Sequence, residues 1–354
     1  MTAAALIQQW QLETVQVGPK FMAMAGSFKD NDFLNYLHAD KNMVDYVEPN
    51  QIYKSDVVIP RGGGNAVMRD AEASNWGLAR INHRSNSDLQ SYTYDENAGQ
   101  GIHAYVLDSG VNVDHKDFGG RAFKEANFIS NEDDDDLGGH GTHVAGKIAG
   151  TVHGVAKGAT IHAVKILDKS GSGTTSGLIK AISHVIEVAE PGKSLINLSL
   201  SGPKSKILDD ILREATQSRN IPVFVSAGNA GTDACYFSPS SSKDVFTVGA
   251  TDSNDKVPNY SDVGKCVSIY APGSNIKSTW IGSDDATKNL DGTSMANPHV
   301  AGIAAILMSQ KNYGSVDELY KDLRSSATTD ALTFGQSKKS TSTNYNLLAY
   351  YGDQ

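Results

Sequence analysis

Four side chains in separate stretches of the chain are of types that can work together in nucleophilic catalysis. Ser294 precedes the apolar run 300–308, which predicts a buried helix. It therefore stands near a helix N-terminus, where free N–H groups favour developing negative charge. His140 begins a second predicted helix, rich in small residues, while Asp108 and Asn229 each end an apolar strand. A serine nucleophile, a histidine base, a carboxylate and an amide donor are the groups that acyl transfer needs.

Each of these residues also has a structural explanation when it is taken alone. Ser294 would be a helix cap, Asp108 a turn former, Asn229 a left-handed turn residue and His140 a hydrogen-bonded polar side chain. His140 and His143 share a helix face, as zinc ligands can. No glutamate follows in the His-Glu-x-x-His pattern, which argues against zinc.

The segments that must position these residues alternate between predicted strands and predicted helices. We expect strands over 102–107, 161–167, 195–200 and 221–226, and helices over 141–150, 175–189 and 207–218. Such alternation predicts an α/β fold, with a mostly parallel sheet and helices on both faces. Sites in these sheets lie at the carboxyl ends of the strands, where Asp108 and Asn229 stand. Pro298 is expected in the first turn of its helix, where a missing N–H is tolerated.

The composition fits a globular protein and argues against two other classes. The chain has 354 residues, of which 39% are hydrophobic and 34 are glycine, enough for one large or two ordinary domains. Its net charge of −9 argues against nucleic acid as a partner. No apolar run is long enough to predict a membrane span. Two cysteines alone do not settle the redox compartment.

Residues 15–50 look like a small separate unit. We expect in it a strand over 21–27, a helix over 31–39 and a strand over 44–48. From 51 to about 74 the periodicity fades, which predicts a flexible, cleavable linker. The larger unit opens with Trp-Gly-Leu-Ala-Arg-Ile at 76–81.

In the order Asp, His, Ser, the motifs resemble those of the subtilisin-like serine proteases. They read Val-Leu-Asp-Ser-Gly at 106–110, His-Gly-Thr-His-Val-Ala-Gly at 140–146 and Gly-Thr-Ser-Met-Ala at 292–296, with Ser-Ala-Gly-Asn at 226–229 as the oxyanion segment. The resemblance covers about residues 73–354 and looks nearest to the proteinase K and cerevisin branch. It implies a subtilisin-like fold and a serine endopeptidase that works through an acyl-enzyme intermediate.

The resemblance also gives each residue a role. Ser294 would attack the peptide carbonyl, His140 would act as the base and Asp108 would orient the imidazole. The side chain of Asn229 and the N–H of Ser294 would bind the oxyanion. Two edge segments and the walls of the primary pocket would bind substrate through Gly171, Ser172, Gly173, Ser199, Leu200, Ser201, Gly202, Ala227 and Gly228. No ring of carboxylates lines that pocket, so we expect a broad specificity that leans to apolar or aromatic residues.

The N-terminal unit resembles the inhibitory prodomain of the same family, which is a small ferredoxin-like α+β fold. We therefore expect a monomeric, self-processed zymogen, with a partial prodomain and linker over 1–72 and a catalytic domain over 73–354. The first strand and helix of that prodomain are not evident, so the N-terminus looks truncated, and no signal peptide is seen. The resemblance implies a secretory route to a vacuole or to the exterior.

Further expectations concern a disulfide, a metal and two rival functions. The resemblance implies a Cys235–Cys266 disulfide, but not the strong calcium site of the branch, because Ser268 stands in place of an aspartate ligand. The four aspartates at 133–136 are expected to form a solvated loop. We assign no metal or cofactor, and calcium binding stays open. The rivals are a catalytically silent relative and an α/β-hydrolase esterase, whose Gly-x-Ser-x-Gly motif and residue order are not found around Ser294.

Overall fold

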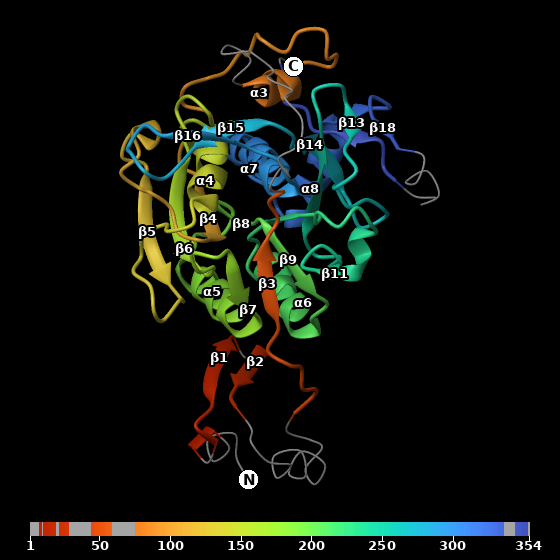
Figure 1. Ribbon diagram of the computed structural model, residues 1–354. Coiled ribbons are helices and arrows are strands. Elements are labelled where there is room, and N and C mark those ends of the chain that lie inside the picture. Colours follow the sequence, from red (N-terminus) through yellow and green to blue (C-terminus); the bar gives the residue numbers. More distant parts are fainter. Residues whose placement is uncertain are drawn as a thin grey trace.

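The computed structural model describes residues 7–8, 10–18, 21–27, 44–58, 75–335 and 344–352. One large sheet runs through the described part of the chain (Figure 1). Its nine strands lie in the order β17 (Thr328–Thr329), β19 (Leu347–Leu348), β14 (Ile269–Pro272), β12 (Phe246–Thr251), β10 (Val223–Ser226), β8 (Ser194–Leu198), β4 (His103–Asp108), β6 (Thr160–Lys165) and β5 (Ala122–Asn127). Neighbouring strands pair in parallel, except for β17 with β19. The predicted α/β fold is confirmed.

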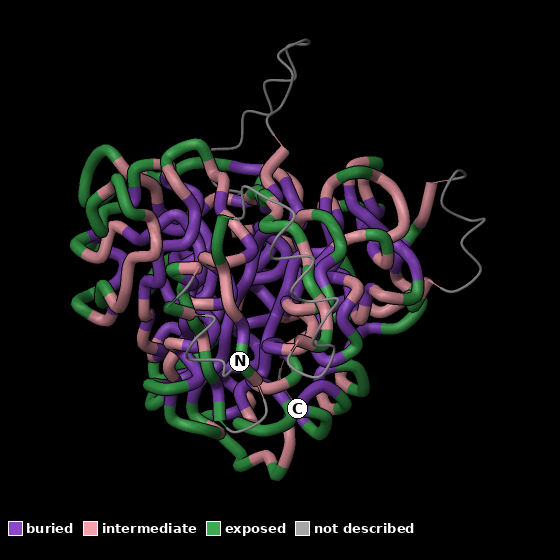
Figure 2. The backbone as a smooth tube through the Cα atoms, turned by 90° about the horizontal axis from the view of Figure 1, so that it is seen from below, coloured by how far each residue is buried: buried purple, intermediate pink, exposed green. Residues whose placement is uncertain are grey.

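Helices cover both faces of this sheet, because alternate residues of a strand point to opposite sides. One face carries α3 (Trp76–Asn82), α4 (His140–Ala149), α7 (Thr293–Gln310) and α8 (Val316–Ser326), and the other carries α5 (Thr175–Val188) and α6 (Lys206–Arg213). In β4, Ala104 and Val106 pack toward the first group, and Tyr105 and Leu107 toward the second. Figure 2 shows the resulting buried interior in purple. None of the described helices has the length and apolar character that a membrane crossing requires.

The strands and helices expected between residues 102 and 226 are all present, with most ends within two residues of the prediction. The helix expected over 207–218 is the exception, since α6 passes at residue 214 into a π-helical turn, η2 (Glu214–Ser218). Two short 3-10 turns are η1 (Lys116–Phe118) and η3 (Ala234–Tyr236). Strands β5, β12 and β14 were not among those expected.

Helix α7 begins earlier than its apolar run indicates, so the prediction for Pro298 is wrong: it lies in the second turn. Because proline has no N–H, the carbonyl of Ser294, four residues earlier, lacks its partner within the helix. The hydroxyl of Ser199 donates to that carbonyl at 3.3 Å. Ser199 thus ties the start of α7 to the segment that follows β8.

A second sheet of four strands has the order β11 (Phe237–Ser238), β9 (Leu200–Pro203), β3 (Ile52–Ser55) and β7 (Ser172–Thr174), with antiparallel neighbours. Two-stranded pairs are formed by β1 (Glu13–Val17) with β2 (Phe21–Ala25), β13 (Lys256–Val257) with β18 (Thr333–Phe334), and β15 (Ile276–Thr279) with β16 (Thr287–Leu290). Strand β3 lies in the expected linker, so the prediction of a structureless segment is wrong for residues 52–55. Four residues are too few for a periodic signal, and β3 takes its hydrogen bonds from β7 and β9.

The N-terminal unit differs from its expected outline. The strand expected over 21–27 is present as β2, and it pairs with β1, which was not expected. The helix expected over 31–39 lies outside the described residues. The strand expected over 44–48 is wrong, because this stretch has no strand pairing among the described residues.

Residues 46–50 instead bind the N-terminal ends of α5 and α6. The carboxylate of Glu48 accepts hydrogen bonds from the N–H of Lys206 at 2.6 Å and from the hydroxyl of Ser205 at 2.8 Å. Asn50 Oδ1 accepts from the N–H of Ser176 at 3.0 Å. A carboxylate and an amide oxygen thus satisfy free donors at two helix starts, where negative charge is favoured. These contacts fix the segment that leads into β3.

The structure confirms the disulfide between Cys235 and Cys266, whose Cα atoms lie 5.4 Å apart. The bridge closes a loop over a sequence separation of 31 residues. By the chain-entropy model, such a loop stabilises the fold by roughly 3.5–4 kcal/mol. We expect the double variant Cys235→Ser, Cys266→Ser to lose about that much free energy of unfolding, measured by urea denaturation. A loss below about 1 kcal/mol would show that the unfolded chain gains little freedom.

Candidate active site

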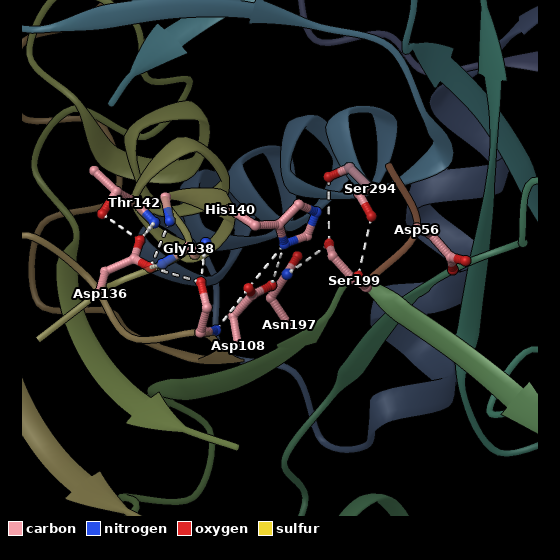
Figure 3. A network of polar contacts seen from close by, with 12 residues as sticks. Asp56, Asp108, Asp136, Gly138, His140, Thr142, Asn197, Ser199 and Ser294 are labelled. Carbon is pink, nitrogen blue, oxygen red and sulfur yellow. Dashed lines mark hydrogen bonds and ion pairs between the residues drawn. The ribbon is translucent and has the colours of Figure 1, made fainter. Parts of the chain in front are cut away.

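The end of β4 and the start of α4 bring Asp108 and His140 together at the carboxyl ends of the strands of the large sheet (Figure 3). His140 Nδ1 lies 2.8 and 2.9 Å from the two carboxylate oxygens of Asp108. Both side chains are buried. Burial lowers the pKa of His140, but the charge of Asp108 and its hydrogen bond outweigh burial, so this pKa is raised above its ordinary value. The imidazole is thus held with Nε2 on the side away from Asp108.

Asp136 fixes the start of α4. Its carboxylate accepts hydrogen bonds from the N–H of Gly139 at 2.7 Å, from the N–H of Thr142 at 2.9 Å and from the hydroxyl of Ser109 at 2.7 Å. The expectation of a solvated acidic loop is therefore wrong for Asp136, which is buried, although the three aspartates before it are exposed. An acidic residue just ahead of a predicted helix start was the signal that could have identified it.

Ser294 lies in the first turn of α7, next to His140. Figure 3 shows the imidazole directed toward this serine. The Ser294 hydroxyl donates to the carbonyl of Ser199 at 3.0 Å, and His140 Nε2 is buried with no hydrogen-bond partner among the described residues. The structure therefore brings the expected nucleophile and the expected base to one place without a hydrogen bond between them.

Asn229 is oriented by Thr293, the residue directly before Ser294. Asn229 Oδ1 accepts from the N–H and from the hydroxyl of Thr293, both at 3.0 Å. This leaves Asn229 Nδ2 buried and unpartnered among the described residues. A Cβ on Gly292 would lie 3.2 Å from this nitrogen and 2.4 Å from the carbonyl oxygen of Asp56. The free donor and that carbonyl therefore border the same small space, which only a glycine leaves open.

Asn297 supports the arrangement from within α7. Its side-chain nitrogen donates to Asn197 Oδ1 at 3.0 Å and to the carbonyl of Phe224 at 3.1 Å. These contacts join α7 to β8 and β10, the two strands that lead to Ser199 and to the segment of Asn229. Asn297 thus positions two parts of the site without contacting the reacting groups.

The expected edge segments flank an extended peptide, and that peptide is the chain's own β3. The N–H of Ser55 donates to the carbonyl of Gly171 at 3.0 Å, and the N–H of Asp56 to that of Ser199 at 3.2 Å. The cross-strand pairs are Tyr53 with Gly173, Lys54 with Ser172 and Ser201, and Ser55 with Leu200. A Cβ on Gly202 would lie 2.5 Å from the ring of Tyr53, so this glycine makes room for the tyrosine.

The side chain of Asp56 lies in the expected primary pocket, which is bounded by Ser199 to Gly202 and by Ser226 to Gly228. Its two carboxyl oxygens each accept a hydrogen bond at 2.6 Å, one from Ser201 and one from Ser226. The N–H of Ser294 donates to the carbonyl of Asp56 at 3.3 Å.

On the far side of Ser294, the N–H of Val58 donates to the carbonyl of Asp291 at 2.8 Å. The chain is thus held on both sides of the Asp56–Val57 bond, at the serine. No sequence signal predicts this arrangement, because neither Asp56 nor Val57 belongs to a recognisable motif. Backbone hydrogen bonds hold the pocket wall in place. The N–H of Ala227 donates to the carbonyl of Val248 at 2.9 Å, and the N–H of Gly228 donates to Thr293 Oγ1 at 3.2 Å.

Known proteins carry the same architecture. The model of the subtilase family matches residues 99–347. Subtilisin-like protease 2 of Pseudogymnoascus destructans is 43% identical over 286 residues, which cover 81% of this chain and 70% of that protein. Cerevisin of Saccharomyces cerevisiae is 43% identical over 306 residues, covering 82% of this chain and 48% of cerevisin, so the chain spans about half of that relative. A crystal structure of a cold adapted subtilisin-like serine proteinase matches with a TM-score of 0.74 at 40% identity, over 80% of this chain and 100% of that one. The chain belongs to the subtilase family.

Proposed function

We propose that this subtilase hydrolyses peptide bonds with Ser294 as nucleophile, His140 as general base and acid, Asp108 as the orienting carboxylate and Asn229 as an oxyanion donor. The observation that carries the proposal is the position of the Asp56 carbonyl. It accepts from the N–H of Ser294 and lies beside the unpartnered Nδ2 of Asn229. A peptide carbonyl is thus placed at the nucleophile and beside two donors.

The reaction begins when the Ser294 hydroxyl turns from the carbonyl of Ser199 toward His140 Nε2, a change of side-chain rotamer. Oγ attacks the peptide carbonyl carbon while His140 takes its proton, and the two donors stabilise the oxyanion. The C–N bond then breaks as His140 gives that proton to the leaving amine. Water attacks the acyl-enzyme in the same way, which releases the new carboxyl group and restores Ser294. Asp108 keeps Nδ1 protonated and stabilises the imidazolium.

We further propose that the chain is a zymogen, with a prodomain and linker over 1–72 and a catalytic domain over 73–354. Strand β3 fills the cleft as a substrate would and so blocks it, while Glu48 and Asn50 hold the preceding segment on α6 and α5. Cleavage of Asp56–Val57 would fall within the expected linker. The prodomain would then act as the enzyme's own inhibitor, bound to a monomer that follows the secretory route to a vacuole or to the exterior.

Specificity is proposed to be broad, with an apolar or aromatic side chain favoured where Tyr53 binds. Tyr53 is fully buried against the cleft, and its hydroxyl donates to the carbonyl of Pro203 at 2.9 Å. Burial raises the pKa of Tyr53 to about 12, so the phenol stays neutral in this position. An aromatic ring at this point, three residues before Asp56, would add apolar contact to the strand pairing.

A fluorophosphonate probe tests the proposal, because it labels only an activated serine. We expect the processed protein to be labelled at Ser294 and to hydrolyse a casein substrate. The variant Ser283→Ala, which changes an exposed serine between β15 and β16, should be labelled equally. A correctly folded protein that binds peptides yet is neither labelled nor active would instead be the catalytically silent relative.

Calcium is expected to stabilise this protein less than relatives that carry an aspartate at the position of Ser268. Ser268 is a poor ligand here, since its oxygen accepts from the N–H of Thr247 at 3.4 Å and carries no charge. No group of three or more candidate metal ligands occurs among the described residues. We expect the thermal midpoint to fall by less than about 5 °C on adding a chelator, and Ser268→Asp to restore a larger calcium response. A fall of 10 °C or more in the unchanged chain would show that calcium binds elsewhere.

A further inference from the structure

The primary pocket is built to bind a side chain that accepts hydrogen bonds. Asp56 is 5% exposed, and its carboxyl oxygens take the hydroxyl protons of Ser201 from β9 and Ser226 from β10. Ser226 is fully buried, and Asp56 is the partner that its hydroxyl finds. An apolar side chain in the same place would leave that buried hydroxyl unpaired, which is costly.

The same pocket offers no cation to a charged carboxylate. In the part of the chain that the structure describes, His140 is the titratable group whose charge acts on Asp56, and no lysine or arginine does so. Asp262 lies behind Gly228 and Asp291 precedes the turn of Ser294, and neither is among the groups whose charge acts on Asp56. Burial raises the pKa of Asp56 to about 6, against the opposing effects of the two hydroxyls and of His140.

We propose that this pocket selects aspartic acid in its neutral form, together with asparagine, and that the first bond it cleaves is Asp56–Val57 of its own chain. The proposal rests on the proposed function, since it takes Ser294 as the nucleophile. It replaces the apolar preference that the sequence predicts for this pocket, because that prediction considered only the pocket walls and not the side chain that fills it. The broad, apolar-leaning preference then concerns the place where Tyr53 binds. Cleavage follows the steps given above, with water as the co-reactant. Ser201 and Ser226 are then the residues that determine specificity.

Because the pocket prefers the neutral acid, binding of an aspartic acid side chain should depend on pH. A carboxyl group whose pKa rises from about 4 in the free peptide to about 6 in the pocket binds best below pH 4 and progressively worse up to pH 6. Above pH 6 both states are ionised and the dependence levels off. Asparagine has a similar shape and cannot ionise, so the Asp/Asn rate ratio removes the titration of His140, which affects both equally.

The experiment compares the full chain with its Asp56→Asn and Asp56→Leu variants between pH 4.5 and 7.5. Conversion is followed by mass spectrometry, with N-terminal sequencing to locate the cut. We expect a new N-terminus at Val57, and conversion of Asp56→Asn about 10- to 100-fold faster than that of Asp56→Leu. For the Asp and Asn peptides described below, which bind from solution, the ratio of the two kcat/KM values should fall about tenfold or more between pH 4.5 and 6.5. Adding Ser226→Ala should largely erase the Asn/Leu difference, while adding Ser283→Ala should leave it unchanged.

A second measurement keeps the test decisive if the chain converts slowly. Peptides of sequence Tyr-Lys-Ser-X-Val, with X as Asp, Asn or Leu, are incubated with the unlabelled protein. A separate sample of the same preparation is tested for labelling of Ser294 by the fluorophosphonate probe. Equal rates for Asn and Leu, a ratio of Asp to Asn that does not change with pH, or a cut at another bond would overturn the inference while the proposed function stands. Absence of both labelling and cleavage would overturn the proposed function itself.

Discussion

Replacing Ser294 with alanine should abolish both peptide hydrolysis and cleavage of the chain at Asp56–Val57. The loss in kcat should be about 10⁶-fold, a figure taken from a bacterial subtilisin, a relative of this chain. The reason is that Oγ forms the acyl bond in the proposed mechanism, while the hydroxyls of Ser201 and Ser226 bind the side chain of Asp56. The residual rate comes from the oxyanion donors, which the substitution leaves in place.

The measurement compares purified Ser294→Ala with the unchanged chain by mass spectrometry and by hydrolysis of a chromogenic peptide. Circular dichroism and the thermal midpoint show whether the variant is folded, because the change also removes the hydrogen bond to the carbonyl of Ser199. Ser283→Ala serves as the matched control and should process normally. If Ser294→Ala still cleaved itself with no other protease present, the nucleophile would be assigned wrongly.

The sheet and its helices could be predicted because their signals are local and repeated. An apolar strand followed by a helix occurs several times between residues 102 and 226, and the topology of such units is restricted. Once β4 and β10 are neighbours of β8 in a parallel sheet, Asp108 and Asn229 must end at the same edge. The motifs added the identity of the histidine and of the serine.

What the sequence did not reveal depends on contacts between distant segments. A run of four aspartates favours water and so predicts a solvated loop, yet Asp136 lies at the start of α4 and binds its free N–H groups. No local pattern predicts that Thr293 orients Asn229, because the two residues are 64 positions apart in the chain. Strand β3 has too few residues for periodicity, and its order comes from β7 and β9. In each case the partner is visible only after folding.

Asn229→Ala should lower kcat by about 10²–10³-fold while leaving KM nearly unchanged. The magnitude is that of an oxyanion asparagine in a subtilisin, a relative of this chain. Nδ2 has no hydrogen-bond partner among the described residues, so removing this nitrogen breaks no hydrogen bond in the ground state. Its contribution arises as negative charge develops on the carbonyl oxygen that borders the Gly292 space. An interaction made only in the transition state changes kcat and not KM.

The variant Asn229→Asp separates the donor from the turn. Aspartate has the same shape, suits the same turn and keeps an oxygen to accept both hydrogen bonds from Thr293, but it replaces the donor with a second oxygen. We therefore expect a loss in kcat at least as large as for alanine, because the new oxygen repels the developing oxyanion. Steady-state kinetics with one peptide on all three proteins decide the matter. If Asn229→Asp kept its kcat, or if Asn229→Ala raised KM alone, Asn229 would be a turn residue, and the oxyanion would depend on the N–H of Ser294.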